Sequence, residues 1–211
     1  LRSKGLIMRQ LPADKYNVAW FKLAEFVARG ERERALSLYK LLIHSFDDYA
    51  LACQLEGDIY LSFNDTQPAC TCYRSAAQIY KDNKRFIEAA AVYEHILTLE
   101  PESLPDLNAI LMLYDKLRLA DRLILHLERL CIFLIRSNNF EQLHLCSNEW
   151  EQKVDGFYCA QLFKNITLAL IKKKVMHDIV SSYLKKALEY LILLENPAGL
   201  QAFLSVVESL D

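Results

Sequence analysis

The fold of this 211-residue chain is decided by one stretch, residues 70–103, with the sequence CTCYRSAAQIYKDNKRFIEAAAVYEHILTLEPES. Its apolar residues recur at intervals of three and four, which is the spacing of an amphipathic helix. A polar break at residues 82–84 divides the stretch, and Pro101 ends it. Short links between helices force the two helices to pack antiparallel. Residues 70–103 therefore predict a helix hairpin.

The same apolar spacing continues on both sides of this stretch, and alternation of period two is absent. We expect about eleven helices of roughly 12 to 18 residues. The breaks between them fall at Pro12, Gly30, Asp47, 64–68, 82–84, 101–105, Arg118, Asn138, 155–156, 172–174 and 196–199. With 5 Gly and 5 Pro, the chain is poor in the residues on which strand hairpins depend. The predicted fold class is all-α.

A constant repeat length distinguishes an array of stacked hairpins from a closed bundle, because an array presents equivalent packing residues at a fixed offset. An offset of 34 holds over three consecutive segments, 36–69, 70–103 and 104–137. The aligned positions are Tyr39, Tyr73 and Leu107; Leu42, Ala76 and Ile110; Ile43, Ala77 and Leu111; Phe46, Tyr80 and Tyr114; Leu55, Ala89 and Leu123; Ile59, Tyr93 and Leu127; and Ser62, Ile96 and Leu130. The pattern predicts three helix-hairpin repeats.

Residues 70–103 resemble the tetratricopeptide repeat, a 34-residue helix-turn-helix unit. The residues that match its pattern are Tyr73, Ala76, Ala77, Tyr80, Ala89, Tyr93, Ile96 and Pro101. The resemblance implies a right-handed α-α superhelix, a solenoid of antiparallel helix pairs. Leu55 and Leu123 stand where the family usually has a small residue, so we expect wider helix spacing in the first and third repeats.

The rest of the chain matches the repeat less well. We expect residues 1–13 to be a linker or chain end, and residues 14–35 to be an N-terminal helical part that could also begin an overlapping repeat. Residues 138–211 are expected to form a degenerate repeat and C-terminal capping helices, since terminal repeats need a polar outer side. The sequence begins at Leu1 without Met, and we expect a piece of a longer protein, which leaves targeting open.

A search for catalytic, cofactor-binding or metal-ligating residues finds no motif. The sequence has no Gly-rich phosphate loop, no nucleophile elbow and no HExxH or DxDxDG string. Glu141 and His144 form one Glu-x-x-His, whereas a di-iron bundle needs a second copy and two further Glu. His44 and Asp48 would form only a weak pair on one helix surface. We expect no enzyme, cofactor or metal site, with an enzyme whose site no motif reveals as an alternative.

Charge, hydropathy and cysteine content limit the partners. A formal net charge of −2 and a pI of about 6.3 supply no general attraction for nucleic acid. No window approaches the ~18 apolar residues that would insert across a membrane. Residues 172–174 form one basic run at a helix end, where lysines meet the helix dipole and solvent. Six cysteines without a CxxC pair favour reduced, buried thiols and a cytoplasmic location.

In tetratricopeptide proteins the first helix of each repeat lines a concave groove that receives a peptide or a helix of another protein. The resemblance therefore implies a protein-binding scaffold or adaptor. Carried over to this chain, the partner-binding positions are Lys40, His44, Arg74, Gln78, Lys81, Asn108, Met112 and Lys116. The family's clamp for a chaperone C-terminus is not matched, because Pro105 and Ala109 stand where Lys and Arg should be.

Self-association is a further alternative. The apolar stretches 123–135 and 188–194 could pack against a second copy instead of the next helix. The sequence then predicts a helical oligomerisation module.

Overall fold

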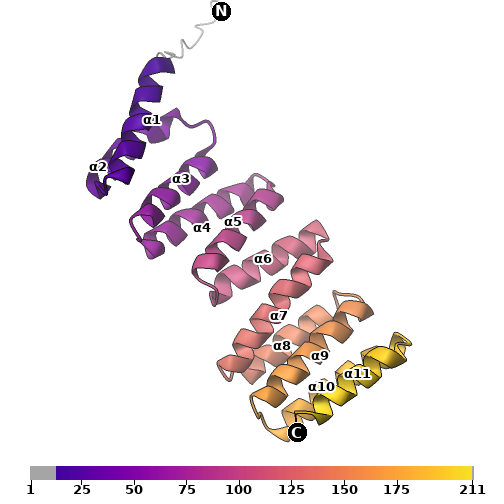
Figure 1. The fold of residues 1–211 in the computed structure, drawn as a ribbon. Coiled ribbons are helices and arrows are strands. Elements are labelled where there is room, and N and C mark those ends of the chain that lie inside the picture. The colour runs from indigo at the N-terminus through magenta and orange to yellow at the C-terminus, as the bar shows by residue number, and fades with distance from the viewer. Residues whose placement is uncertain (1–12, 211) are drawn as a thin grey trace, which may run out of the picture. The chain divides into compact units, whose positions relative to one another are not determined.

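The computed structural model describes residues 13–210, and most of these lie in helices (Figure 1). They are α1 (Ala13–Ala28), α2 (Arg32–Leu42), the short 3-10 helix η1 (Ile43–Ser45), α3 (Tyr49–Ser62), α4 (Thr66–Asp82), α5 (Phe86–Leu99), α6 (Leu104–Leu117), α7 (Ala120–Arg136), α8 (Phe140–Glu151), α9 (Gly156–Lys172), α10 (His177–Leu193) and α11 (Pro197–Glu208). No β-strand occurs among the described residues, so the prediction of an all-α fold with eleven helices is confirmed. The expected linker 1–13 lies outside the described range except for Ala13, which begins α1.

The chain forms two compact units, Leu1–Pro101 and Glu102–Asp211. In the first unit, α2 packs against α1, and α4 packs against both α3 and α5. In the second unit, α6 packs against α7, and α9 packs against α10. Each of these pairs consists of helices that follow one another in the chain, as helix hairpins require. The expected division into the repeats 36–69, 70–103 and 104–137 stays a prediction.

Most of the helices end with the same backbone motif. A residue in the left-handed conformation follows the helix, and the next N–H donates to the carbonyl five residues earlier, as in Arg85 to Tyr80 and Leu119 to Tyr114. This is the Schellman closure, which satisfies carbonyls that the helix leaves without a partner. The left-handed residues are Gly30, Asn64, Lys84, Arg118, Asn138, Lys174 and Glu195. They lie at or near the sequence breaks, which explains how a chain with few glycines turns so often.

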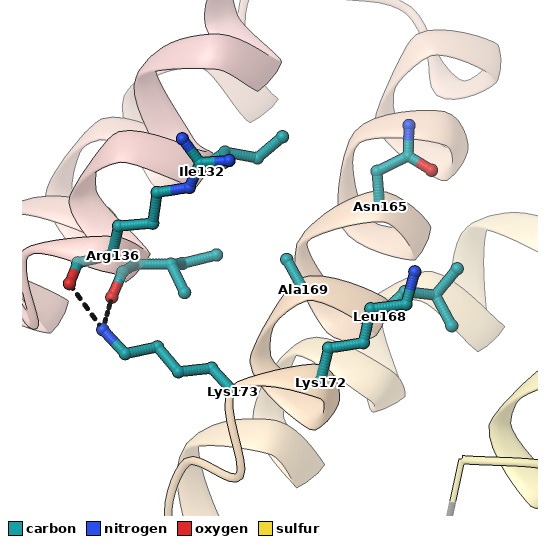
Figure 2. Close-up of a pocket in the computed structure, with 8 residues that line it drawn as sticks. Ile132, Arg136, Asn165, Leu168, Ala169, Lys172 and Lys173 are labelled. Atoms are coloured by element: carbon teal, nitrogen blue, oxygen red, sulfur yellow. Dashed lines mark hydrogen bonds between the residues drawn. The ribbon is translucent and has the colours of Figure 1, made fainter. Parts of the chain in front are cut away.

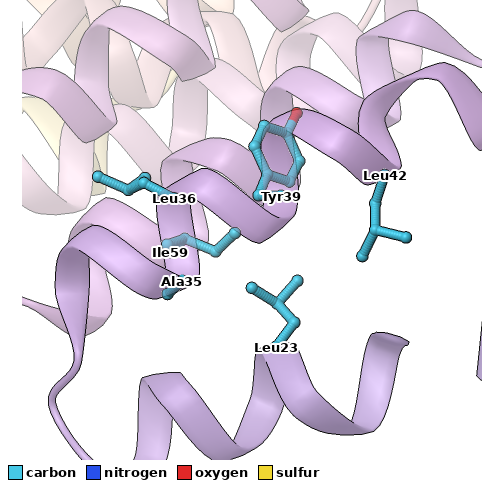
Figure 3. Close-up of a cluster of buried hydrophobic side chains, with 6 residues drawn as sticks. All are labelled: Leu23, Ala35, Leu36, Tyr39, Leu42 and Ile59. Carbon is cyan, nitrogen blue, oxygen red and sulfur yellow. The ribbon is translucent and has the colours of Figure 1, made fainter. Parts of the chain in front are cut away.

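The core of the first unit begins where α1, α2 and α3 meet (Figure 3). Its buried side chains are Leu23, Ala35, Leu36, Tyr39, Leu42 and Ile59. Tyr39 is 1% exposed, and its hydroxyl donates to the Ala52 carbonyl oxygen at 2.6 Å. The tyrosine therefore fills the core with its ring and still satisfies its polar atom on α3.

Small residues bring α3 and α4 close together. A Cβ atom added at Gly57 would lie 2.6 Å from Cε1 of Tyr73, so the ring of Tyr73 packs directly on the α3 backbone. The Tyr73 hydroxyl donates to Asp58 Oδ1 at 2.6 Å, and the Tyr80 hydroxyl donates to Gln54 Oε1 at 2.9 Å. Both tyrosines of α4 thus bind α3 through apolar and polar contacts.

Equivalent burial is found at the positions that share the 34-residue offset. Tyr39, Tyr73 and Leu107 are 1%, 2% and 0% exposed, which places the same helix position in the core each time. Ala77 and Ala89 are fully buried between α4 and α5, as the small positions of a tetratricopeptide repeat require.

The first repeat departs from this regularity. α2 ends at Leu42 and is followed by η1, and α2 packs more extensively on α1 than on α3. Leu55, which stands at the usual small position, is only half-buried, and Ser62 is exposed. The expected wider helix spacing in this repeat stays a prediction.

Replacing Gly57 by alanine tests the close approach of α3 and α4. Alanine is intrinsically better than glycine inside a helix by roughly 1 kcal/mol. The new methyl group would nevertheless overlap the buried ring of Tyr73, and overpacking costs about 1–3 kcal/mol. We expect Gly57→Ala to lower the free energy of unfolding, measured by urea denaturation with far-UV circular dichroism.

Gly156→Ala is the matched control. The nearest atom to a Cβ at Gly156 is a ring carbon of Tyr190 at 3.7 Å, an ordinary contact, so this variant should be as stable as the wild type or more stable. Equal stability of both alanine variants would contradict the packing described for α3 and α4.

Candidate functional site

The exposed side of α4 carries three of the predicted partner-binding residues, Arg74, Gln78 and Lys81. Arg74 forms an ion pair with Glu100, which also accepts from Gln67 Nε2 at 2.8 Å. Gln78 Nε2 donates to Asp82 Oδ1 at 2.7 Å, and Lys81 Nζ donates to Gln78 Oε1 at 3.3 Å. The opposite side of the helix is buried through Tyr73, Ala76, Ala77 and Tyr80. This polar face is therefore held in place by the core beneath it.

Lys40 and His44 lie near the end of α2. Lys40 is exposed on its last turn, and His44 is exposed in η1, beyond the end of the α-helix. The expected pair of His44 with Asp48 is wrong, because Asp48 caps α3 instead. Its Oδ1 accepts from the Ala50 N–H at 3.0 Å, and its Oδ2 accepts from Arg85 at 2.5 Å. The Arg85 hydrogen bond lowers the pKa of Asp48.

The remaining predicted residues, Asn108, Met112 and Lys116, belong to the second unit. They are exposed and follow one another at intervals of four on one face of α6. Met112 is 59% exposed, although methionine is usually buried. This face combines a flexible apolar side chain with an amide and an ammonium group.

A cavity of about 670 Å³ lies between α7 and α9 in the second unit (Figure 2). Ile132, Leu168 and Ala169 supply its apolar lining, and Arg136, Lys172 and Lys173 supply positive charge. Lys173 Nζ donates to the backbone carbonyls of Ile135, at the end of α7, and of Arg136, at 2.7 Å for the latter. The basic run 172–174 lies at the end of α9, as expected, and Lys173 in addition caps the end of α7, which the sequence did not predict.

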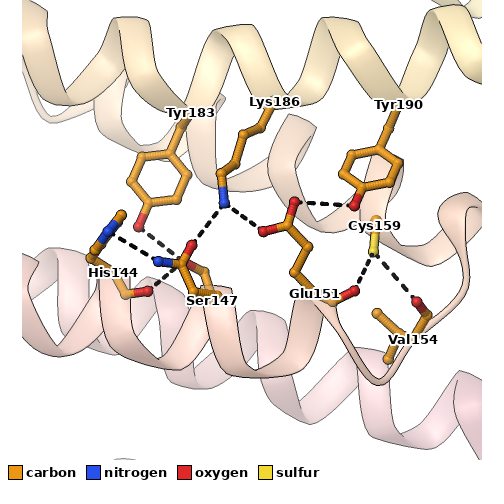
Figure 4. A network of polar contacts seen from close by, with 9 residues as sticks. His144, Ser147, Glu151, Val154, Cys159, Tyr183, Lys186 and Tyr190 are labelled. Atoms are coloured by element: carbon orange, nitrogen blue, oxygen red, sulfur yellow. Dashed lines mark hydrogen bonds and ion pairs between the residues drawn. The ribbon is translucent and has the colours of Figure 1, made fainter.

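A polar network joins α8, α9 and α10 in the same unit (Figure 4). Lys186 Nζ donates to Glu151 Oε2 at 2.5 Å and to Asn148 Oδ1 at 2.7 Å, and the Tyr190 hydroxyl donates to Glu151 Oε1 at 3.0 Å. Ser147 and Tyr183 share a hydrogen bond of 3.1 Å, and burial raises the pKa of Tyr183 to about 12. Such a network fixes the orientation of the helices that it joins.

The histidine and cysteine residues of the described range do not gather into a metal-binding group. His144 Nε2 lies 3.0 Å from Asn148 Nδ2, and the described residues hold no group of three side chains suited to a metal ion. All six cysteines are free, and five are buried. Burial raises the pKa of Cys53, and raises the pKa of Cys72 to about 12, so both thiols stay protonated at neutral pH. Protonated thiols are poor nucleophiles.

The recurring hairpins, with bulky residues buried at one helix position every 34 residues, define the class of the fold. It is an all-α fold of helix hairpins, and its spacing of buried residues resembles that of the tetratricopeptide repeat. No helix in residues 13–210 is both long and apolar enough to span a membrane.

Comparison with known proteins finds likeness only among solved structures, since no family model and no curated protein matches the chain. MamA is 15% identical with a TM-score of 0.29, over 80% of this chain and 93% of MamA. A tetratricopeptide repeat protein from Parabacteroides merdae is 15% identical with a TM-score of 0.29, over 92% and 99% of the two chains. Naa15/Naa10 bound to HypK-THB is 14% identical with a TM-score of 0.27, over 93% of this chain and 39% of that one. The class of fold rests on the hairpins described above.

Lys173→Ala tests the link between α9 and α7. The substitution removes two charge-assisted hydrogen bonds to backbone carbonyls, and such bonds contribute about 1.5–3 kcal/mol each when the groups are buried. Lys173 is only half-buried, so we expect a loss of about 1–2 kcal/mol in the free energy of unfolding, measured by urea denaturation.

Lys174→Ala is not suitable as a control, because Lys174 adopts the left-handed conformation after α9 and its substitution would also change the backbone energy there. Lys172→Ala is matched better, since Lys172 is exposed at the end of α9 and has no partner among the described residues. It should change stability by less than about 0.5 kcal/mol. A loss of similar size in both variants would contradict the capping role of Lys173.

Proposed function

We propose that this chain is a protein-interaction scaffold or adaptor that binds a peptide or a helix of a partner protein. The observation that carries the proposal is the exposed polar face of α4, on which Arg74, Gln78 and Lys81 are ordered by neighbouring side chains. Ordered side chains lose less conformational entropy when a partner binds. Such a face suits a segment with carboxylate or backbone carbonyl groups.

Each residue of this face has a separate part in the proposal. Arg74 and Lys81 would donate charge-assisted hydrogen bonds to partner oxygens. The amide of Gln78 lies between them and would accept or donate, as the partner requires. In the second unit, Met112 would provide an adaptable apolar contact beside Asn108 and Lys116.

The proposal includes no catalytic step. The free, buried cysteines support a reducing compartment such as the cytoplasm. The modest net charge favours a protein partner over nucleic acid.

Self-association is a second candidate, favoured by the end of α10. Ile192 and Leu193 are 63% and 75% exposed there, and apolar side chains so exposed often mark contacts with other chains. The other apolar stretch expected to self-associate, 123–135, is mostly buried within its own unit, with Leu127, Leu130 and Leu134 at 2% exposure or less. Only the α10 stretch therefore supports this candidate.

A double charge reversal, Arg74→Glu with Lys81→Glu, tests binding on α4. We expect the amount of protein captured by the immobilised 211-residue chain to fall by at least about tenfold, because both donors become acceptors. Capture is quantified by mass spectrometry, and far-UV circular dichroism verifies folding. In the double reversal, the new glutamate at position 74 would also be repelled by Glu100. The neutral variant Arg74→Gln with Lys81→Gln avoids this repulsion and should also capture less protein than the wild type.

The control reverses the same number of charges on α1. Lys22→Glu with Arg29→Glu removes only exposed charges and one exposed pair with Glu25, and surface pairs of this kind contribute little to stability. It should retain capture. If the α4 variants capture their partners as well as the wild type, this surface is not the binding site.

A further inference from the structure

The outer side of α3 carries an apolar surface that the first unit leaves open. Two cavities of about 400 Å³ each lie along it, one on the side of α1 and one on the side of α5. Leu55 and Asp58 line both cavities, so the two adjoin on α3. An open apolar surface of this extent is typical of an interaction site.

The cavity beside α1 is almost entirely apolar. Its walls are Trp20, Leu23, Ala24, Val27 and Ala28 of α1, together with Leu55 and Ile59 of α3. The polar residues that line it are Asp58 and Ser62. Water in such a cavity has few hydrogen-bond partners, so filling it with apolar side chains is favourable.

The cavity beside α5 continues this surface. Phe46, Leu51, Ala91 and Val92 line it, together with Gln54, Tyr73 and His95. The rings of Trp20 and Phe46 meet edge to face with centroids 5.4 Å apart, so an aromatic contact connects the ends of the two cavities. Leu51 is 49% exposed, which leaves an apolar side chain at the rim.

Asp58 is the one acidic residue that lines either cavity. The Tyr73 hydroxyl donates to its Oδ1, and this bond holds the carboxylate at the junction of the two cavities. Asp48 and Asp65 of the same unit pair with Arg85 and Arg32, whereas Asp58 pairs with no Lys or Arg in the described residues. An exposed carboxylate without a cation, set in an apolar surface, is complementary to an apolar partner with one positive charge.

We propose that the outer face of α3 docks an amphipathic helix of another protein, with apolar side chains in the two cavities and a Lys or Arg paired with Asp58. Ala24, Ala28 and Ala91 line the walls and let a helix backbone approach closely. Leu51, Leu55, Asp58 and Ser62 follow one another at intervals of four, three and four, which is the spacing that a second helix can match. This surface is distinct from the α4 face and goes beyond the function proposed above.

A labelled helical peptide tests the proposal on the 211-residue chain. The probe has about 18 residues, leucines at intervals of three and four, and one lysine within the leucine face. Its binding is measured by fluorescence anisotropy, beside a second probe that has glutamate in place of the lysine. We expect the lysine probe to bind the wild type more tightly than the glutamate probe, and to shift amide resonances in α1, α3 and α5.

Asp58→Asn is the diagnostic variant, because asparagine keeps an oxygen that accepts from Tyr73 while it loses the charge. It should weaken binding of the lysine probe by about fivefold and abolish the difference between the two probes. Leu55→Ser, which removes the apolar side chain shared by both cavities, should weaken both probes by about tenfold. Asp82→Asn is the matched control on α4 and should leave both affinities unchanged.

The α4 double reversal separates this proposal from the proposed function, because it should leave probe binding intact. Equal affinity of wild type and Asp58→Asn for the lysine probe would overturn the inference, as would resonance shifts confined to α4. A dimer of the chain in analytical ultracentrifugation that Leu55→Ser dissociates would overturn it too, since the occupant would then be a second copy.

Discussion

The close approach of α4 to both of its neighbours is the constraint on which the first unit depends. Gly57 lets the ring of Tyr73 lie on the backbone of α3, and Ala77 and Ala89 let α5 pack on the other side. Because protein interiors are packed as densely as organic crystals, a larger side chain at these places would separate the helices. The hydroxyl bond from Tyr73 to Asp58 depends on the same spacing. The exposed face of α4 is ordered only because its buried face leaves the helix no freedom to rotate.

The turns between helices depend on a second constraint, a left-handed backbone conformation after most of the helices. Here it is adopted by residue types that sequence patterns rarely associate with it. Lys84, Arg118, Lys174 and Glu195 adopt the left-handed conformation that glycine prefers. A non-glycine residue there costs roughly 1–2 kcal/mol. The Schellman hydrogen bonds and the packing of both flanking helices offset that cost. This explains why the breaks are visible in the sequence as changes of apolar spacing but not as glycines.

The apolar spacing is sufficient to predict the number of helices, and the 34-residue offset is sufficient to predict that Tyr39, Tyr73 and Leu107 share a buried position. The local sequence pattern does not predict a contact that depends on a residue far away in the sequence. Asp48 does not pair with His44, because its carboxylate binds the N-terminus of α3 and Arg85 instead. Arg85 is 37 residues away in the sequence. Helix geometry indicates that Arg74 faces outward, but its pairing with Glu100 depends on how α4 and α5 are packed. The role of Gly57 is hidden because it lies outside the repeat pattern.

The outer surface of α3 follows from the same packing that orders α4. The residues that α3 buries are mostly small: Ala50, Ala52, Cys53 and Gly57, together with Ile59. The larger apolar residues Leu51 and Leu55 line the open surface between α1 and α5. An ordinary surface helix exposes polar residues there instead. Burial of those leucines by another chain would restore the usual distribution, and Asp58, which the unit itself leaves without a cation, would determine the charge that such a chain must carry.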